Sequence, residues 1–248
     1  MAVVCKTPRT IISATGFCAG CGHGIINRIT AEALEELGVD KKTIMALGVG
    51  CCSLMGFNFG VDRIGSPQGR APAVATGIKR LQPDKVVMTY QGDGDISSIG
   101  CAEIVHAAAR NEKITTIFVN NGVYGMTGGQ MAPTTLPNQV TTTSPKGRDP
   151  ELTGMPIKIT EMIAVLPVAY VARGSVHNPA AIRKAKGYIK QALQAQLNGE
   201  GFSMVEILSP CPTNWHLSPL KALERIENEV IPYYPMGELV KREGTANA

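Results

Sequence analysis

The stretch KVVMTYQGDGDISSIGCAEIVHAAARNEKITTIFVNN, residues 85–121, decides which fold we expect for this chain. Lys85 to Tyr90 and Ile114 to Val119 are short, mostly apolar runs, as is typical of strands that are buried on both faces of a sheet. Between them, Ser97 to Arg110 has apolar residues at helical spacing and begins with serines that can cap a helix. A strand, a helix and a strand in this order predict a right-handed crossover between two parallel strands.

The same alternation of helices and strands extends on both sides of this unit. We expect the stretch 127–156, which is rich in Thr, Pro and Gly, to be a long functional loop, and we expect an irregular tail at the end of the chain. Together the patterns predict one α/β domain over residues 1–248, with a doubly wound, mostly parallel sheet and helices on both faces. The further elements that we predict are helices over 24–37, 72–81, 160–166, 179–197 and 219–230 and strands over 43–49, 168–172 and 203–208.

Composition narrows the classes of function. The chain has 248 residues, of which 44% are hydrophobic and 18% are charged, and this excludes a disordered or coiled-coil protein. The formal net charge of +4 is not gathered into a long basic block, so we expect no nucleic-acid partner. No segment approaches the roughly 20 apolar residues that span a bilayer, and the N-terminus lacks a signal pattern. We therefore expect a cytoplasmic protein with no membrane contact.

Polar residues follow the two strands of the central unit at the point where each strand ends. Gly92-Asp93-Gly94 comes after the first strand, and Asn120-Asn121 comes after the second. Because the carboxyl ends of neighbouring parallel strands meet at one edge of a sheet, an Asp and an Asn can face the same point there. Carboxylate, amide and main-chain oxygens are ligands that suit Mg²⁺ beside a diphosphate. The alternative is that both motifs form only tight turns and that Asp95 only starts a helix.

The chain has seven cysteines, and this odd number favours metal or redox chemistry over structural disulfides in a cytoplasmic protein. Thiolates gathered at one edge of the sheet bind either Zn²⁺ or an iron–sulfur cluster, and a thioredoxin-like dithiol is the alternative for an isolated CxxC motif. We interpret Cys5 and Cys101 as buried cysteines without a ligand. The other five lie before the first helix or after predicted strands: Cys18, Cys21, Cys51, Cys52 and Cys211.

The motif GDGD, followed by a helix, an apolar strand and NN, resembles the thiamine diphosphate signature of that enzyme superfamily. The resemblance implies the thiamine diphosphate-binding fold. It further implies that Asp93 and Asn121 supply side-chain ligands to Mg²⁺ and that Val123 supplies a main-chain carbonyl. The cofactor-binding residues that it implies are Gly50, Gly69, Gly92, Asp93, Gly94, Asp95, Asn120, Asn121, Val123 and Tyr124.

The chain as a whole resembles the β subunit of 2-oxoacid:ferredoxin oxidoreductases. The matching stretches are CAGCGHG at 18–24, GVGCC at 48–52, GRAPAVATGIKR at 69–80, TYQGDGD at 89–95, VNNGVYGMTGGQMAPTT at 119–135 and SPCPTNW at 209–215. In this family the β subunit carries thiamine diphosphate and a 4Fe-4S cluster. The cluster ligands map here to Cys18, Cys21, Cys51 and Cys211, with Cys52 as the alternative to its neighbour. Gln68 stands where many relatives have His, which leaves a diphosphate contact from this position open.

The resemblance implies CoA-dependent oxidative decarboxylation of a 2-oxoacid to acyl-CoA, CO₂ and reduced ferredoxin. The stretches GRAPAVATGIKR and MTGGQMAPTT are most similar to the branched-chain 2-oxoisovalerate enzymes, with the 2-oxoglutarate enzymes as the alternative. The glutamate that activates thiamine is expected on an α subunit that carries the pyrimidine-binding domain, and γ and ferredoxin-like subunits are the further partners. From the residues themselves, two other functions remain open: a subunit of a non-oxidative thiamine-dependent decarboxylase, and a zinc-binding module.

Overall fold

A computed structural model describes residues 6–242 of the chain. Its centre is a seven-stranded sheet in the order β2-β1-β3-β4-β8-β7-β9. Every neighbouring pair is parallel except β7 and β9, which are antiparallel. The strands are β1 (Thr43–Leu47), β2 (Asp62–Gly65), β3 (Val86–Gly92), β4 (Thr115–Asn120), β7 (Tyr170–Ser175), β8 (Ser203–Leu208) and β9 (Gly237–Lys241).

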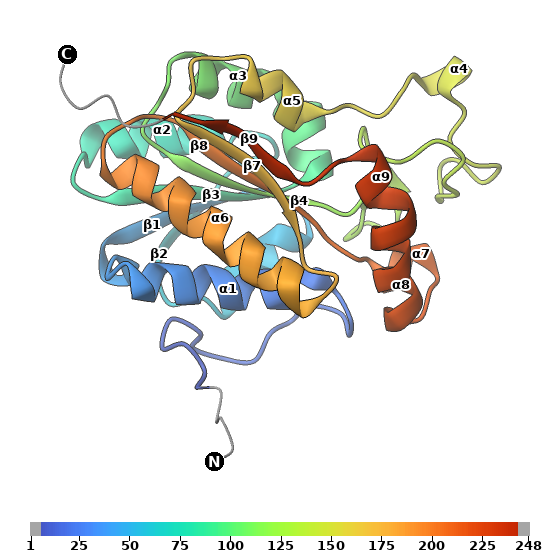
Figure 1. Cartoon of the computed structure of the whole chain (residues 1–248), viewed down its shortest axis with the longest axis horizontal. Helices are drawn as coiled ribbons and strands as arrows, with labels where there is room; N and C mark the ends of the chain where they lie inside the picture. Colours follow the sequence, from blue (N-terminus) through green and yellow to red (C-terminus); the bar gives the residue numbers. More distant parts are fainter. Residues whose placement is uncertain (1–5, 243–248) are drawn as a thin grey trace.

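Helices cover both faces of this sheet (Figure 1). Helices α1 (Gly22–Glu36) and α6 (Pro179–Leu197) pack side by side on one face, while α2 (Ala71–Leu81), α3 (Cys101–Ala109) and α5 (Ile159–Ala164) lie on the other. Successive side chains of β3 point to opposite faces of the sheet, so this strand contributes to an apolar layer on each face. Met88 and Tyr90 belong to the cluster with α1 and α6, and Val87 belongs to the cluster with α2 and α3. The predicted doubly wound α/β fold is therefore confirmed.

Two strands of the seven-stranded sheet were not expected from the sequence. All four residues of β2 are exposed at the sheet edge, so no apolar pattern marks this strand. Strand β9 lies in the stretch that we expected to be irregular, and it adds to the other edge in the antiparallel direction. The helix expected to begin at Ser97 instead begins at Cys101, because a π-helical turn over Asp95–Ile99 precedes it.

The remaining helices are short. They are α4 (Pro150–Thr153), α7 (Pro212–Trp215), α8 (Pro219–Arg225) and α9 (Ile231–Tyr233). A π-helical turn over Ile226–Val230 joins α8 to α9, so the helix expected over 219–230 is present in two parts. Within residues 6–242, no helix combines the length and the apolar character that crossing a membrane requires.

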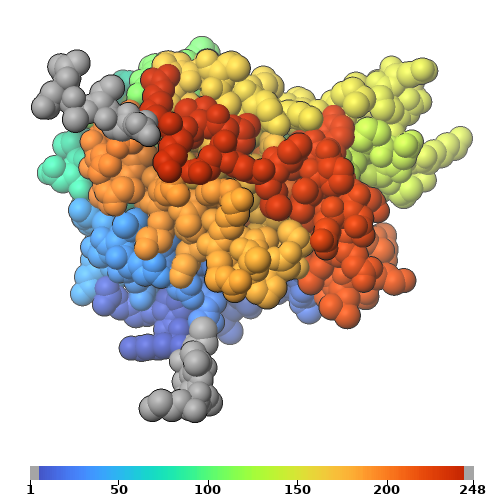
Figure 2. All heavy atoms as spheres, in the orientation of Figure 1, coloured from blue at the N-terminus to red at the C-terminus, as the bar shows by residue number. Residues whose placement is uncertain are grey.

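The stretch 127–156 is ordered by the buried side chain of Arg148, which is 4% exposed. Two short strands, β5 (Val123–Tyr124) and β6 (Gln130–Met131), pair at its start. Figure 2 shows this region projecting from the body of the molecule beside the C-terminal helices. The Arg148 guanidinium donates hydrogen bonds to main-chain carbonyls of Ala132, Pro133, Thr135, Thr153 and Gly154. One cation therefore satisfies carbonyls from both ends of a loop that has little apolar core of its own.

Candidate functional site

A small hollow lies at the carboxyl ends of β1, β3 and β4. The register places Leu47 beside Tyr90 and Gly92 beside Val119, so the loops that follow these strands start side by side. This open hollow has a volume of about 30 Å³, which suits an ion or a water molecule and little else. Its lining residues are His23, Val49, Gly50, Cys51, Cys52, Gly92, Asp93, Gly94, Asp95, Asn121, Val123, Tyr124 and Gly125.

A larger cavity of about 640 Å³ lies at the opposite, amino ends of the strands. Lysines are prominent among its lining residues, which include Lys42, Lys79, Lys85 and Lys113. None of the site residues expected from the sequence lines it. The largest of these spaces therefore does not coincide with the edge at which the sequence places the site.

Asp93 is the central side chain of the small hollow and is 2% exposed. Its Oδ1 accepts a hydrogen bond from the Gly94 amide at 2.9 Å. Its Oδ2 accepts hydrogen bonds from the Gly122 amide at 2.7 Å and from the Thr134 hydroxyl at 2.5 Å. Burial raises the pKa of Asp93 to about 6, although these donors oppose the rise. All three donors are neutral, so the carboxylate is a buried charge that a cation would stabilise.

The paired asparagines have different environments. Asn121 lines the hollow, and its Oδ1 accepts a hydrogen bond from the Val123 amide at 3.0 Å. Asn120 does not line this hollow; its Nδ2 donates to Glu206 Oε1 at 2.7 Å, inside the protein. Successive residues of a strand point to opposite sides, and Asn120 is the last residue of β4. Only the second asparagine therefore faces the edge.

Asp95 shapes the wall of the hollow. Its Oδ1 accepts hydrogen bonds from the amides of Val49 at 3.0 Å and Gly69 at 2.9 Å, and its Oδ2 accepts one from Gln91 Nε2 at 2.6 Å. Gly69 does not line the hollow itself; its amide donates to Asp95, which does. Asp95 connects the loops after β1 and β3 to the segment before α2.

Two aromatic side chains complete the hollow. The Tyr124 hydroxyl donates to the Gly94 carbonyl at 3.1 Å, and a Cβ at position 94 would lie 2.2 Å from the tyrosine ring. Only glycine fits there. His23 is 1% exposed, its Nδ1 lies 2.7 Å from the Tyr90 hydroxyl, and its ring stacks on Phe17. Burial lowers the pKa of His23 to about 4, so the imidazole is neutral at pH 7 and adds no positive charge beside Asp93.

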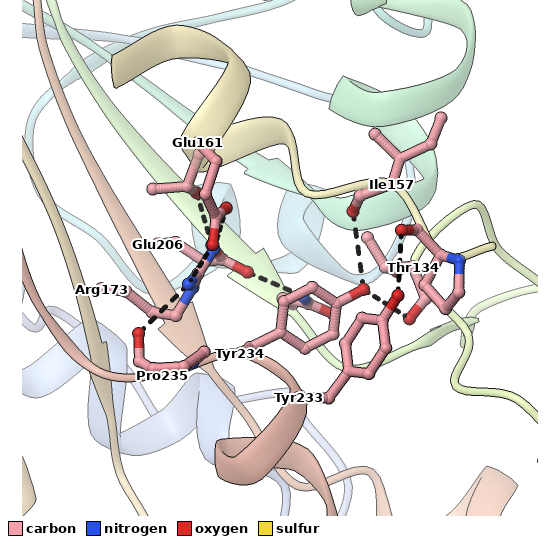
Figure 3. A network of polar contacts seen from close by, with 11 residues as sticks. Thr134, Ile157, Glu161, Arg173, Glu206, Tyr233, Tyr234 and Pro235 are labelled. Atoms are coloured by element: carbon pink, nitrogen blue, oxygen red, sulfur yellow. Dashed lines mark hydrogen bonds and ion pairs between the residues drawn. The ribbon is translucent and has the colours of Figure 1, made fainter. Parts of the chain in front are cut away.

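A buried ionic network supports the site from behind (Figure 3). Arg173 and Glu206 are directly paired in register across β7 and β8, and each side chain is 1% exposed. Arg173 Nε donates to Glu206 at 2.6 Å, and the same guanidinium bonds Glu161 of α5. Glu206 also accepts hydrogen bonds from Asn120 and from Thr160. The end of β4 is therefore anchored to the neighbouring strands.

The same network also reaches Asp93, through Tyr234 and Thr134. The guanidinium of Arg173 lies 5.3 Å from the centre of the Tyr234 ring, and the Tyr234 hydroxyl donates to the Thr134 carbonyl at 3.0 Å. Thr134 in turn donates to Asp93. None of these residues was expected at the site from the sequence. The available signal was a charge on each of two adjacent, otherwise apolar strands, at positions 173 and 206.

The cysteines of the same edge lie near one another. Burial raises the pKa of Cys21 to about 12, and the charges of Cys211, Cys51 and Cys18 add to the increase. Burial also raises the pKa of Cys51 to about 11, with further contributions from Cys211 and Cys18. Cys211 is 7% exposed, and burial raises its pKa while a hydrogen bond from Asn214 opposes the rise. The four thiols of Cys18, Cys21, Cys51 and Cys211 thus share one electrostatic environment.

The other cysteines differ from this set. Cys52 is 1% exposed and packs into the apolar cluster with Met55 and Phe59. Burial raises the pKa of its thiol, and the charges of Asp95 and Cys51 add to the increase. Cys101 packs against the apolar cluster on the opposite face of the sheet. Cys5 lies outside the described residues.

The spacing of the thiols bears on the kind of metal site. Among residues 6–242, no group of three or more His, Cys, Asp or Glu side chains is arranged to hold a single metal ion. A structural zinc site would bring four ligands to one ion at about 2.3 Å, whereas an iron–sulfur cluster binds thiolates through several irons and so spreads them further apart. Within residues 6–242, the four thiols are thus not gathered around the position of a single ion.

Comparison with known proteins places the chain among thiamine pyrophosphate enzymes. The family model described as "Thiamine pyrophosphate enzyme, C-terminal TPP binding domain" matches residues 48–207. The chain is 46% identical over 225 residues to the ketoisovalerate oxidoreductase subunit VorA of Methanothermobacter thermautotrophicus, covering 90% of this chain and 47% of that protein. It is 36% identical to the 2-oxoglutarate synthase subunit KorB of Archaeoglobus fulgidus, covering 88% of this chain and 78% of that one.

A solved structure is also similar. It is the 2-oxoglutarate:ferredoxin oxidoreductase from Magnetococcus marinus with 2-oxoglutarate, coenzyme A and succinyl-CoA bound. The TM-score is 0.75 at 28% sequence identity, and the match covers 97% of this chain and 87% of the other. The chain thus spans nearly all of that protein chain but only about half the length of the ketoisovalerate relatives that it matches.

We predict that Gly48→Ala destabilises the protein through Asp95. An alanine Cβ would lie 2.4 Å from Asp95 Oδ2, so the carboxylate must leave the amides of Val49 and Gly69. We expect a loss of about 1–3 kcal/mol in the free energy of unfolding, measured by urea denaturation. The control is Gly77→Ala within α2, where the Cβ meets nothing within 4 Å and should stabilise by about 0.5–1 kcal/mol. Equal stabilities of the two variants would contradict this role of Asp95.

Proposed function

The chain belongs to the thiamine pyrophosphate enzyme family and, within it, to the subunits of 2-oxoacid:ferredoxin oxidoreductases; on this premise we propose that it is the diphosphate-binding subunit of such a complex. The reaction is CoA-dependent oxidative decarboxylation of a 2-oxoacid. One observation carries the proposal: a buried carboxylate with only neutral donors lies in the same hollow as one of four neighbouring thiols. When bound, thiamine diphosphate supplies carbanion chemistry and an iron–sulfur cluster supplies one-electron acceptance.

We propose that Asp93 and Asn121 hold Mg²⁺ with their side-chain oxygens and that Val123 adds its carbonyl. The donor set fits, because it consists of hard oxygens and includes one carboxylate that is buried without a cation. The diphosphate would lie against the main chain of Gly50, Gly92 and Gly94, where side chains are absent. Asp95 and Tyr124 shape the wall of that space. Gly69 and Asn120 do not line that space. Gly69 holds Asp95 in place through a hydrogen bond, and Asn120 is itself held by a hydrogen bond to Glu206.

We propose that Cys18, Cys21, Cys51 and Cys211 bind a 4Fe-4S cluster. The mutual influence of their thiols supports this set, and the packing of Cys52 into the apolar core favours Cys51 as the third ligand. The proximity of Cys51 to Asp93 is also relevant, because electrons released at the diphosphate site have a short path to a cluster there. The described cysteines are free thiols, as expected in a reducing compartment, and we place the complex in the cytoplasm.

Partners complete the site. The hollow of about 30 Å³ encloses only a small part of an organic cofactor, so we propose that an α subunit with the pyrimidine-binding domain covers the rest and supplies the activating glutamate. Further γ and ferredoxin-like subunits would carry electrons to ferredoxin. Identity is higher to the ketoisovalerate relatives, at 46%, than to the 2-oxoglutarate relatives, at 36%, and this supports a branched-chain 2-oxoacid as substrate.

The first prediction concerns the metal. Asp93→Asn keeps the shape of the side chain but removes the only charge assigned to Mg²⁺, so we expect at least tenfold weaker binding of Mg²⁺ and thiamine diphosphate. Isothermal titration of the cofactor-stripped complex measures this affinity. Asp84→Asn, on the exposed turn before β3, is the control and should bind as the wild type does. Wild-type affinity in Asp93→Asn would rule out the metal assignment.

The second prediction concerns the cysteines. Alanine at position 18, 21, 51 or 211 should lower the iron content of the anaerobically purified complex, because each change removes one cluster ligand. Alanine at position 52 or 101 should leave the iron content unchanged. Iron and acid-labile sulfide assays measure the effect. If Cys52→Ala loses iron and Cys51→Ala keeps it, the third ligand is the second cysteine of the doublet.

The function itself is tested with the whole complex under anaerobic conditions. We expect CoA-dependent reduction of a viologen dye with 2-oxoisovalerate at a higher kcat/KM than with 2-oxoglutarate or pyruvate. The chain without its partners should show no turnover, because the activating glutamate is on another subunit. Turnover by the isolated chain would contradict the shared site. Release of CO₂ without dye reduction would instead indicate a non-oxidative decarboxylase.

A further inference from the structure

Helix α7 connects the Cys211 turn to the loop that carries Asn121. Asn214 Nδ2 lies 3.4 Å from Cys211 Sγ and donates to the Gly125 carbonyl at 3.0 Å. The next residue, Trp215, donates its indole N–H to the Asn121 carbonyl at 3.1 Å. Two adjacent side chains therefore link the segment after β8 to both ends of the Asn121–Gly125 loop. Neither residue has a role in the proposed function described above.

The orientation of the Asn214 amide follows from its partners. A main-chain carbonyl only accepts hydrogen bonds, so the group that faces Gly125 must be the NH₂ and not the oxygen. The two hydrogens of Nδ2 suffice for the Gly125 carbonyl and the Cys211 sulfur together. Glycines permit this approach: a Cβ at Gly129 would lie 2.9 Å from Asn214 Oδ1, and a Cβ at Gly125 would lie 3.2 Å from Cys51 Sγ.

We propose that Asn214 is a positioning residue that raises the reduction potential of the cluster bound by Cys211, by holding an N–H donor against its sulfur. This inference rests on the proposed function, in which Cys211 is a cluster ligand. When a cluster accepts one electron, its total charge becomes more negative by one unit, and part of that charge is on the thiolate sulfurs. A donor to sulfur therefore stabilises the reduced form more than the oxidised form.

The hydrogen bond from Asn214 to the Gly125 carbonyl fixes the direction of the second N–H of the amide. Because Gly125 holds one hydrogen of the amide, the other is directed at Cys211 without free rotation of the side chain. The donor is thus fixed before reduction, and no reorganisation is needed when the electron arrives. Gly125 also lines the hollow that contains Asp93, so the same amide contacts the wall of one cofactor site and a ligand of the other.

The test is a redox titration of the anaerobic complex, followed by electron paramagnetic resonance, with dithionite as the source of electrons. The signal of this cluster is identified as the one that Cys211→Ala removes. Asn214→Leu should shift its potential to more negative values by roughly a tenfold change in the one-electron equilibrium, about 59 mV. Thr213→Leu is the matched control, because Thr213 is the exposed residue of α7 that precedes Asn214. The reduction potential of the cluster in this variant should equal that of the wild type.

The outcomes separate the inference from the proposed function. An unchanged potential in Asn214→Leu with full iron content would overturn the inference and leave the cluster assignment intact. If the leucine variant loses iron, Asn214→Asp decides instead: it keeps the size of the side chain, has no donor and adds a negative charge, so its shift should be at least as large. If Cys211→Ala keeps every signal of the wild type, the cluster assignment fails, and the inference fails with it.

Discussion

The buried carboxylate of Asp93 is the constraint around which the carboxyl edge of the sheet is arranged. Its hydrogen bonds come from Gly94 after β3, from Gly122 after β4 and from Thr134 in the long loop, so three segments must keep their places together. Charging a carboxyl group in this setting costs free energy, which is why its pKa is raised to about 6. A bound cation would remove most of that cost. Binding of the metal and ordering of these loops are therefore expected to be coupled.

The ion pair of Arg173 and Glu206 is also buried. In contrast to Asp93, each of its charges has an oppositely charged partner. Such pairs add little net stability, since the loss of hydration offsets the attraction between the charges. Their geometry, however, has few alternatives, and here it fixes Asn120 on one side and the Tyr234 ring on the other. The network thus ties the start of the loop that carries Asn121 to the packed strands β7 and β8.

The sequence was sufficient for the parts of the fold that repeat a pattern, and insufficient for those that depend on single contacts. The β3–α3–β4 unit, the two apolar faces and helix α6 follow from the spacing of apolar residues. Strand β2 has no buried face, and the order within 127–156 depends on one buried arginine, so neither leaves a local signal. The cysteine set was predicted as a group, but the sequence leaves Cys51 and Cys52 equivalent. Only the fold shows that Cys52 packs into the apolar core and that Cys51 is partly exposed.

The four thiols of the cluster set are contributed by opposite ends of the chain, with Cys18 before the first helix and Cys211 after the eighth strand. Contacts between such distant segments form late, because closing a long loop must precede them. During synthesis, a ribosome-bound chain lacks the fourth thiol until almost the entire sheet has been translated. On the proposed assignment, insertion of a cluster would follow completion of the fold, and cells would need to deliver iron and sulfide to an already folded set of thiols.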